Sequence, residues 1–140
     1  ALMENDIQFD ENLVVEGEFM SDVGNEWLER FSEQGIKPDG IIASDDLIAF
    51  GIMKLLAKHR LKVPEDIAVG SFNNVPLSEF SSPTLTSVDV DAYGLGANAF
   101  ELLFNCINSN YKSFNRAIIP AKIVVRNSSL RKDAARSQPV

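Results

Sequence analysis

Three side chains with complementary binding chemistry each follow a short apolar run of the sequence: Phe19, Asp45 and Asn73. If the three runs are neighbouring parallel strands, these side chains meet at the carboxyl ends of the strands. Open α/β sheets bind ligands at that edge, where helix N-termini also offer free N–H groups. A carboxylate and an amide can hydrogen-bond hydroxyl groups, and an aromatic ring can cover an apolar face. The combination suits a small polar molecule with one apolar face, such as a sugar.

Each of these residues also has an explanation that needs no ligand. Asn73 and Asn74 are typical of a turn, because asparagine tolerates left-handed backbone angles and caps helices. Phe19 can belong to the core. Asp45 and Asp46 can both cap the helix that follows them. Of these two carboxylates we interpret Asp46 as the capping residue and Asp45 as the ligand-binding one.

Catalytic chemistry has little support in the sequence. Asp45 and Asp46 could act as an acid and a base, or Asp45 could accept a phosphoryl group at a strand end. A phosphoacceptor site would require a lysine at the end of a later strand, but the residue at that position is Asn73. His59 is the single histidine and Cys106 the single cysteine, so neither a Ser-His-Asp set nor a metal cluster is favoured. We expect a protein that is no enzyme and that binds no metal and no cofactor.

Charge and composition limit the function further. The chain of 140 residues has 13 Lys and Arg against 20 Asp and Glu, a net charge of −7. A surface that grips DNA needs clustered basic residues, so this chain alone should not bind nucleic acid well. Its apolar runs are shorter than the roughly 20 residues of a membrane span. One cysteine cannot form an internal disulfide, which favours a reducing, cytoplasmic location.

The candidate ligand-binding residues need a particular order of elements. Strands are predicted over residues 13–19, 40–43 and 66–72, with helices between them over about 22–34 and 46–59. Gly35 fits a left-handed cap at the end of the first of these helices. This strand–helix alternation predicts an α/β fold with a parallel sheet, right-handed crossovers and a strand order centred on the first three strands.

The second half of the chain is less regular. We predict a short helix over residues 76–80, an extended segment over 85–90 and a long helix over 92–108. Residues 117–125 alternate around a proline, which predicts two short edge strands. From about residue 130 onward the polar sequence predicts a disordered tail.

Both well-defined helices are more apolar than one sheet requires. The 92–108 helix has a single narrow polar stripe. Because the rest of its surface is apolar, this helix needs packing partners on more than one side. In the 46–59 helix, the residues predicted to face the sheet leave Phe50 and Met53 on a flank. The sheet-facing residues are Ile48, Ile52, Leu55 and Leu56. Either the domain is larger than this chain, or the chain dimerises, or both.

Four segments in register resemble the effector-binding region of LacI/GalR-type bacterial transcription regulators. They are KPDGIIASDDLIAFG (37–51), VPEDIAV (63–69), FNNVPL (72–77) and SPTLTSV (82–88), and IVVRNS (123–128) resembles the last strand of that family. The chain departs from the family pattern in having Asp-Asp in place of Asn-Asp at 45–46. It also has Ser-Phe-Asn-Asn in place of Gly-Phe-Asp-Asp at 71–74. The second variant resembles maltose-operon repressors of Gram-positive bacteria, which would make maltose or a maltodextrin the effector.

The resemblance implies a periplasmic-binding-protein-like (type I) fold, a Rossmann-like lobe with a mostly parallel sheet flanked by helices. Residues 1–129 would form the C-terminal part of the sugar-binding domain, with 91–115 packing on an N-terminal lobe, and 130–140 would be a disordered tail. The DNA-binding headpiece would lie outside this chain. A small sugar would then bind between the lobes, and Phe19, Asp45 and Asn73 would contact it from this side.

The resemblance also implies a homodimer, because a two-fold operator requires a two-fold protein. Phe50 and Met53 would lie in the dimer interface, joined by Phe80 from the neighbouring short helix. Operator DNA would be bound only through the headpiece. A solute-binding protein for sugar transport or chemotaxis shares this fold and remains the alternative; a signal peptide upstream would indicate it, and a helix-turn-helix would indicate the regulator.

Overall fold

A computed structural model describes residues 2–16, 30, 31, 33–108 and 116–131 of the chain. The chain divides into two compact units, Ala1–Lys37 and Pro38–Val140. Within the described part, no helix is both long and apolar enough to cross a membrane.

The first unit carries two 3₁₀ turns, η1 (Met3–Asn5) and η2 (Glu11–Leu13). A strand was expected over 13–19, but η2 includes Leu13 and residues 14–16 form no strand. For the described residues 13–16 that prediction is wrong. The Asp10 carboxylate accepts the Asn12 N–H at 2.9 Å and so starts the turn. Arg30 donates to the carbonyls of Asn12 and Val14 at 3.0 and 3.2 Å. Local side-chain bonds of this kind compete with the ladder that a strand needs.

The predicted helix end before residue 35 is confirmed. Gly35 has a φ of +66°, the left-handed conformation that glycine adopts without a Cβ clash. The Ile36 N–H donates to the Phe31 carbonyl at 2.8 Å, which closes the helix end as a Schellman-type cap does. The predicted start of this helix lies outside the described residues.

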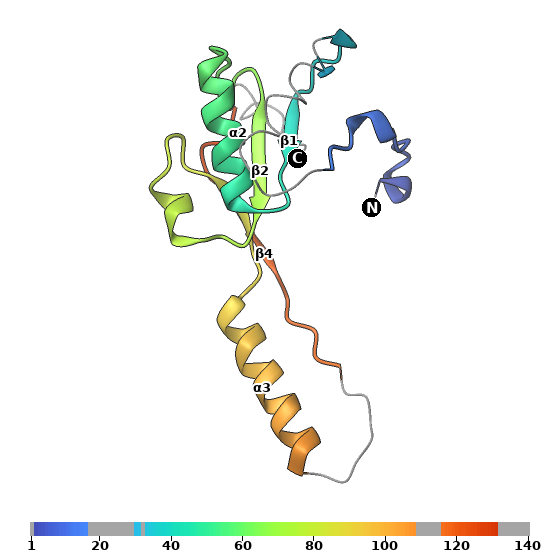
Figure 1. The fold of residues 1–140 in the computed structure, drawn as a ribbon, viewed down its shortest axis with the longest axis vertical. Helices are drawn as coiled ribbons and strands as arrows, with labels where there is room; N and C mark the ends of the chain where they lie inside the picture. Colours follow the sequence, from blue (N-terminus) through green and yellow to red (C-terminus); the bar gives the residue numbers. More distant parts are fainter. Residues whose placement is uncertain (1, 17–29, 32, 109–115, 132–140) are drawn as a thin grey trace, which may run out of the picture. The chain divides into compact units, whose positions relative to one another are not determined.

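The second unit contains a four-stranded sheet (Figure 1). Its strands are β1 (Gly40–Ile42), β2 (Ala68–Phe72), β3 (Thr86–Asp89) and β4 (Lys122–Val124), and they lie in that order. β1 pairs with β2 and β2 with β3 in parallel, whereas β4 pairs with β3 antiparallel. The predicted α/β class with a mostly parallel sheet is therefore confirmed. The predicted strand order, centred on the strands over 13–19, 40–43 and 66–72, is wrong: β1 lies at the edge, β2 and β3 lie at the centre, and the described residues 13–16 form no strand.

Helix α2 (Asp46–Lys58) lies against β2, and its bounds match the prediction within one residue (Figure 1). Its buried apolar side chains are Ala49, Ile52, Met53 and Leu56. Met53, expected on the flank beside Phe50, is only 8% exposed, so most of its side chain is covered within the chain. The helix is rotated relative to the prediction because its first residue, Asp46, is itself fully buried and fixes which face turns inward.

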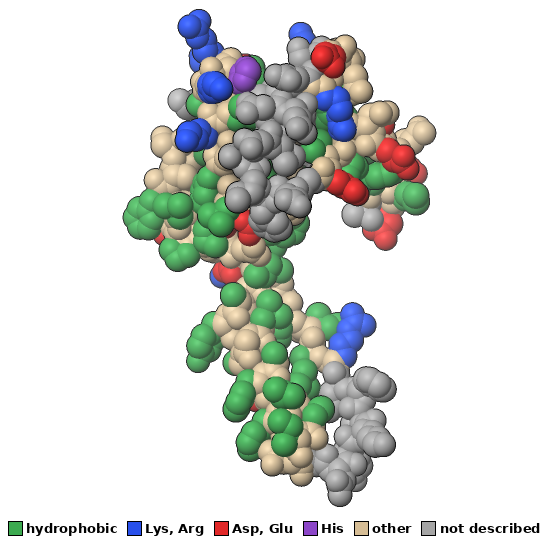
Figure 2. All heavy atoms as spheres, viewed as in Figure 1, with side chains coloured by type: hydrophobic (Ala, Val, Ile, Leu, Met, Phe, Trp, Pro, Cys, Tyr) green, Lys and Arg blue, Asp and Glu red, His purple; other side chains and the backbone are tan. Residues whose placement is uncertain are grey.

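The remaining elements follow the sequence pattern with one exception. The 3₁₀ helix η3 (Pro76–Glu79) and helix α3 (Ala92–Asn108) lie where helices were predicted. β4 is the single strand between residues 117 and 125, where two had been predicted. None of the described α3 side chains is buried, and apolar side chains cover much of the surface of α3 in Figure 2.

A C-terminal segment completes the sheet between β2 and β3. Ser128 is fully buried, and it exchanges hydrogen bonds with both strands. Its carbonyl accepts from the Val69 N–H at 2.8 Å, and its hydroxyl accepts from the Thr86 N–H at 2.8 Å and donates to the Val69 carbonyl at 2.6 Å. Arg131, predicted to lie in a disordered tail, donates to the Pro64 and Asp39 carbonyls, and residues 132–140 lie outside the described part.

Candidate functional site

Two of the three predicted ligand-binding residues lie together at the carboxyl ends of the parallel strands. Asp45 follows β1 and Asn73 follows β2, and the Asn73 amide donates to Asp45 Oδ2 at 2.7 Å. The other carboxylate oxygen of Asp45 accepts the Leu47 N–H at 2.7 Å, so Asp45 is also the N-cap of α2. The structure thus brings Asp45 and Asn73 into contact; that they bind a ligand stays a prediction. Phe19, the third predicted residue, lies outside the described residues.

A left-handed turn presents Asn73 at the surface. Asn73 and Asn74 have φ angles of +95° and +48°, a region that asparagine enters more readily than most residues. The Asn73 N–H donates to the Val88 carbonyl of β3 at 2.9 Å, so the turn is tied to the sheet. Asn73 is exposed and uses one amide hydrogen on Asp45. Among the described residues, its Oδ1 and second N–H have no further partner, which leaves an acceptor beside a donor, the pairing that adjacent hydroxyl groups require.

Asp46 has a role that the sequence interpretation missed. It was expected to cap α2, but Asp45 does so, and the Asp46 carboxylate is fully buried. Oδ1 accepts from the hydroxyls of Ser71 and Ser87, the latter at 2.7 Å. Oδ2 accepts from the Ser78 hydroxyl at 2.9 Å and the Val75 N–H at 2.7 Å. One side chain therefore joins α2 to β2, β3 and the segment that leads into η3.

These four hydrogen bonds keep the carboxylate ionised. Burial raises the pKa of Asp46, but the bonds from the three serines and from Val75 outweigh it, and the net pKa lies below the usual 3.8. A signal for this cluster exists in the sequence: a serine stands within the apolar run of β2, at 71, and another follows Leu85 and Thr86 in β3, at 87. Buried polar residues of this kind need partners, and a nearby aspartate is a suitable one.

Acid should destabilise the chain partly through Asp46. Because its pKa is lowered on folding, its contribution is present above the unfolded pKa of 3.8 and disappears as the pH falls through the folded value. We expect the difference in free energy of unfolding between the unaltered chain and Asp46→Asn to be largest near pH ~7 and to shrink towards pH ~2. Urea unfolding at several pH values measures it, and a difference that does not vary with pH would contradict an ionised Asp46.

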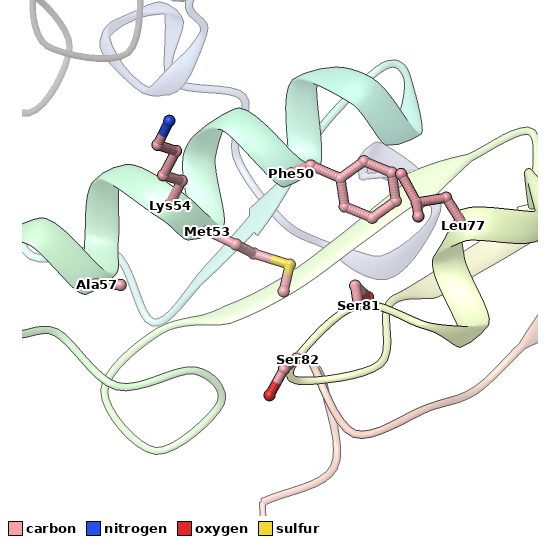
Figure 3. A pocket seen from close by; sticks show the side chains of 7 residues that line it. All are labelled: Phe50, Met53, Lys54, Ala57, Leu77, Ser81 and Ser82. Carbon is pink, nitrogen blue, oxygen red and sulfur yellow. The ribbon is translucent and has the colours of Figure 1, made fainter.

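A groove lies between α2 and the segment formed by η3 and the loop after it. This groove has a volume of about 320 Å³. It is lined by Phe50, Met53, Lys54, Ala57, Leu77, Ser81 and Ser82. Figure 3 shows the Phe50 ring directed towards Leu77 and the Met53 thioether directed towards the loop of Ser81 and Ser82. Two of the three predicted interface residues therefore line one groove, and the third, Phe80, is 79% exposed in the neighbouring segment.

Metal binding finds no site in the described part of the chain. No group of three or more His, Cys, Asp or Glu side chains there is arranged to hold a metal ion. The chemistry that the described site offers is hydrogen bonding by a carboxylate and an amide.

Comparison with known proteins gives a consistent result. Residues 2–129 match the family model described as a periplasmic binding protein-like domain. The HTH-type transcriptional repressor PurR of Vibrio atlanticus (strain LGP32) is 36% identical over 107 residues, which are 76% of this chain and 32% of that protein. The chain thus spans about a third of the length of that relative.

Solved structures agree. The putative transcriptional regulator LacI from Bacillus cereus subsp. cytotoxis NVH 391-98 superposes with a TM-score of 0.84 at 32% identity, over 92% of this chain and 46% of that one. The transcriptional regulator CelR, solved as a cellobiose complex, gives a TM-score of 0.81 at 26% identity, over 91% of this chain and 39% of that one. In both cases the similarity covers nearly all of this chain.

Proposed function

Because the chain belongs to the periplasmic-binding-protein-like domain family, in its LacI/GalR-type regulator branch, we propose that it is the sugar-sensing part of a transcriptional repressor. Residues 1–129 would form the C-terminal part of an effector-binding domain whose other lobe and DNA-binding headpiece are supplied outside this chain. The proposed role is binding, with no catalytic step. It is exerted on operator DNA, and therefore in the cytoplasm.

The observation that carries this proposal is the contact between Asp45 and Asn73. A carboxylate and an amide, held 2.7 Å apart at the ends of two parallel strands, offer acceptors and a donor to vicinal hydroxyl groups. A sugar presents such hydroxyls. The complex of the CelR regulator with cellobiose supports the same ligand class, and maltose is the sugar that the Ser-Phe-Asn-Asn variant favours.

The surface of α3 supports a second lobe. Its large apolar side chains are exposed, with Tyr93 at 89% and Ile107 at 73%. Phe100 and Phe104 stack on one another with ring centroids 6.0 Å apart. An apolar helix face of this size is stable in water only when another surface covers it. We assign that surface to the N-terminal lobe, on which residues 91–115 would pack.

The groove of Phe50 and Met53 supports a homodimer. The Phe50 ring is half-buried at the edge of the groove, Leu77 faces it, and Phe80 is exposed nearby. Apolar side chains that rim a shallow groove are typical of a surface between subunits. Dimerisation would place two headpieces on a two-fold operator.

A direct test is calorimetric titration of the complete regulator with maltose and with cellobiose, using glycerol as a polyol that has hydroxyls but no sugar ring. We expect saturable binding of at least one disaccharide and none of glycerol. Operator affinity, measured with and without the bound sugar, should then change. If neither disaccharide binds while an unrelated class of metabolite does, the assignment to sugars is wrong.

A further inference from the structure

The turn that carries Asn73 is held from below by a short chain of hydrogen bonds. The Asn74 N–H donates to the Ser87 hydroxyl at 2.9 Å, and that hydroxyl donates to Asp46 Oδ1 at 2.7 Å. The next amide of the turn, Val75 N–H, donates to the other oxygen of the same carboxylate at 2.7 Å. Two consecutive amides that follow Asn73 are therefore fixed by Asp46, one through Ser87 and one directly.

The same carboxylate also fixes the other half of the site. Asp46 is the first residue of α2 and is bonded covalently to Asp45. The Asp46 side chain is fully buried, and its carboxylate accepts all four hydrogen bonds. It therefore cannot shift without breaking several of them. The positions of Asp45 and of the turn that carries Asn73 are therefore both fixed by one buried carboxylate, that of Asp46.

We propose that Asp46, acting through Ser87, is a positioning residue that sets the separation of Asp45 and Asn73 in the effector site. The effect of this positioning on binding rests on the proposed function, because the separation of Asp45 and Asn73 matters only if a sugar bridges the two side chains. Asp46 and Ser87 hold Asp45 and Asn73 in their relative positions before a ligand binds. This lowers the free-energy cost of ordering the site on binding.

Ser71 supplies the control that separates positioning from stability. Ser71 and Ser87 are register partners on β2 and β3, both are buried, and both donate to Asp46 Oδ1. They differ in one respect. Ser87 accepts the Asn74 N–H, whereas the second contact of the Ser71 hydroxyl is the Thr86 carbonyl at 3.4 Å. Removing either hydroxyl costs the anion one donor, but only the removal of the Ser87 hydroxyl also takes away the acceptor of the Asn74 N–H.

The turn keeps a second anchor when Ser87 is altered. The Arg126 guanidinium donates to the Asn74 side-chain oxygen at 2.9 Å and to the Leu85 carbonyl at 2.7 Å. Ser87→Ala should therefore loosen the turn without releasing it, and the expected effects are moderate.

The test compares Ser87→Ala with Ser71→Ala in the complete regulator by two measurements. The first is hydrogen exchange of peptides spanning residues 72–80, without ligand; we expect exchange in Ser87→Ala to be about ten-fold faster than in Ser71→Ala. The second is calorimetric affinity for whichever of maltose and cellobiose binds the unaltered protein. We expect Ser87→Ala to weaken it about three- to ten-fold relative to Ser71→Ala, as for the loss of one hydrogen bond. Urea unfolding should show similar losses of stability in both variants.

The two measurements fail in different ways. If the two variants match one another in exchange and in affinity, whether both are unchanged or both are impaired, the positioning role is wrong. If neither sugar binds the unaltered protein, the proposed function fails in its ligand class. The exchange comparison then still decides whether Asp46 fixes the Asn73 turn through Ser87.

Discussion

Replacing Asn73 with alanine should weaken sugar binding by about ten-fold or more, because a buried polar partner left unpaired costs on the order of 1–3 kcal/mol. The variant loses the amide that donates to Asp45, together with the acceptor and the second donor that face solvent. Asp45 keeps its bond from Leu47 and so remains the cap of α2. Calorimetric titration with the sugar that binds the unaltered protein measures the change.

Backbone strain must be separated from the lost contacts in this experiment. Asn73 has a φ of +95°, where alanine is disfavoured and glycine is not. Asn73→Gly removes the same side chain without that strain, so we expect it to lose as much affinity as Asn73→Ala and less stability. If Asn73→Gly binds the sugar with unchanged affinity, Asn73 is not part of the effector site.

A charge at Phe50 should convert the proposed dimer to monomer. Burial of one phenylalanine contributes about 1.5–3 kcal/mol, and a two-fold interface contains two copies, so Phe50→Glu should raise the dimer dissociation constant by about 10²–10⁴-fold. Phe50 is half-buried within its own chain and rims the groove, so part of the ring is available to a partner. Analytical ultracentrifugation measures the shift. Operator affinity should fall with it, while sugar affinity should change little.

Tyr93→Glu is the matched control for that variant. Tyr93 is also an exposed aromatic residue, but it lies on α3, a different apolar surface. We expect this variant to remain dimeric. If instead Tyr93→Glu is monomeric and Phe50→Glu is still dimeric at micromolar concentration, the subunit interface lies on α3 and the groove is not part of it.

The bounds of α2 and β2, which carry the candidate site, were predictable because capping residues and the hydrophobic pattern indicate the same positions. The aspartate pair before α2, the basic end of that helix and the apolar run of β2 all indicate the same boundaries. Residues 13–16 show where the pattern fails. Leu13, Val14 and Val15 are apolar and suited to a strand, but the Asp10 cap and the Arg30 bonds bind that backbone locally.

The roles of Asp45 and Asp46 were exchanged in the sequence interpretation for a similar reason. Both residues can cap a helix, and which one does so depends on the phase of α2. That phase is set by hydrogen bonds from serines 25, 32 and 41 residues away along the chain. Contacts between distant segments, which periodicity within one helix does not contain, decided both positions.

The position of Ser128 has a consequence for the order in which the protein can be made. Val69 and Thr86 leave the ribosome well before Ser128, yet their backbone groups between β2 and β3 find their partners only in that residue. Until it emerges, β2 and β3 can pair directly over Gly70–Phe72 and Thr86–Val88, but the bonds of Val69 and of the Thr86 N–H at one end of that pair are missing. Contacts between residues this far apart are slow to form. This end of the sheet should therefore form late in biosynthesis, and a ribosome that stalls before the codon of Ser128 should hold an incompletely folded, protease-sensitive domain.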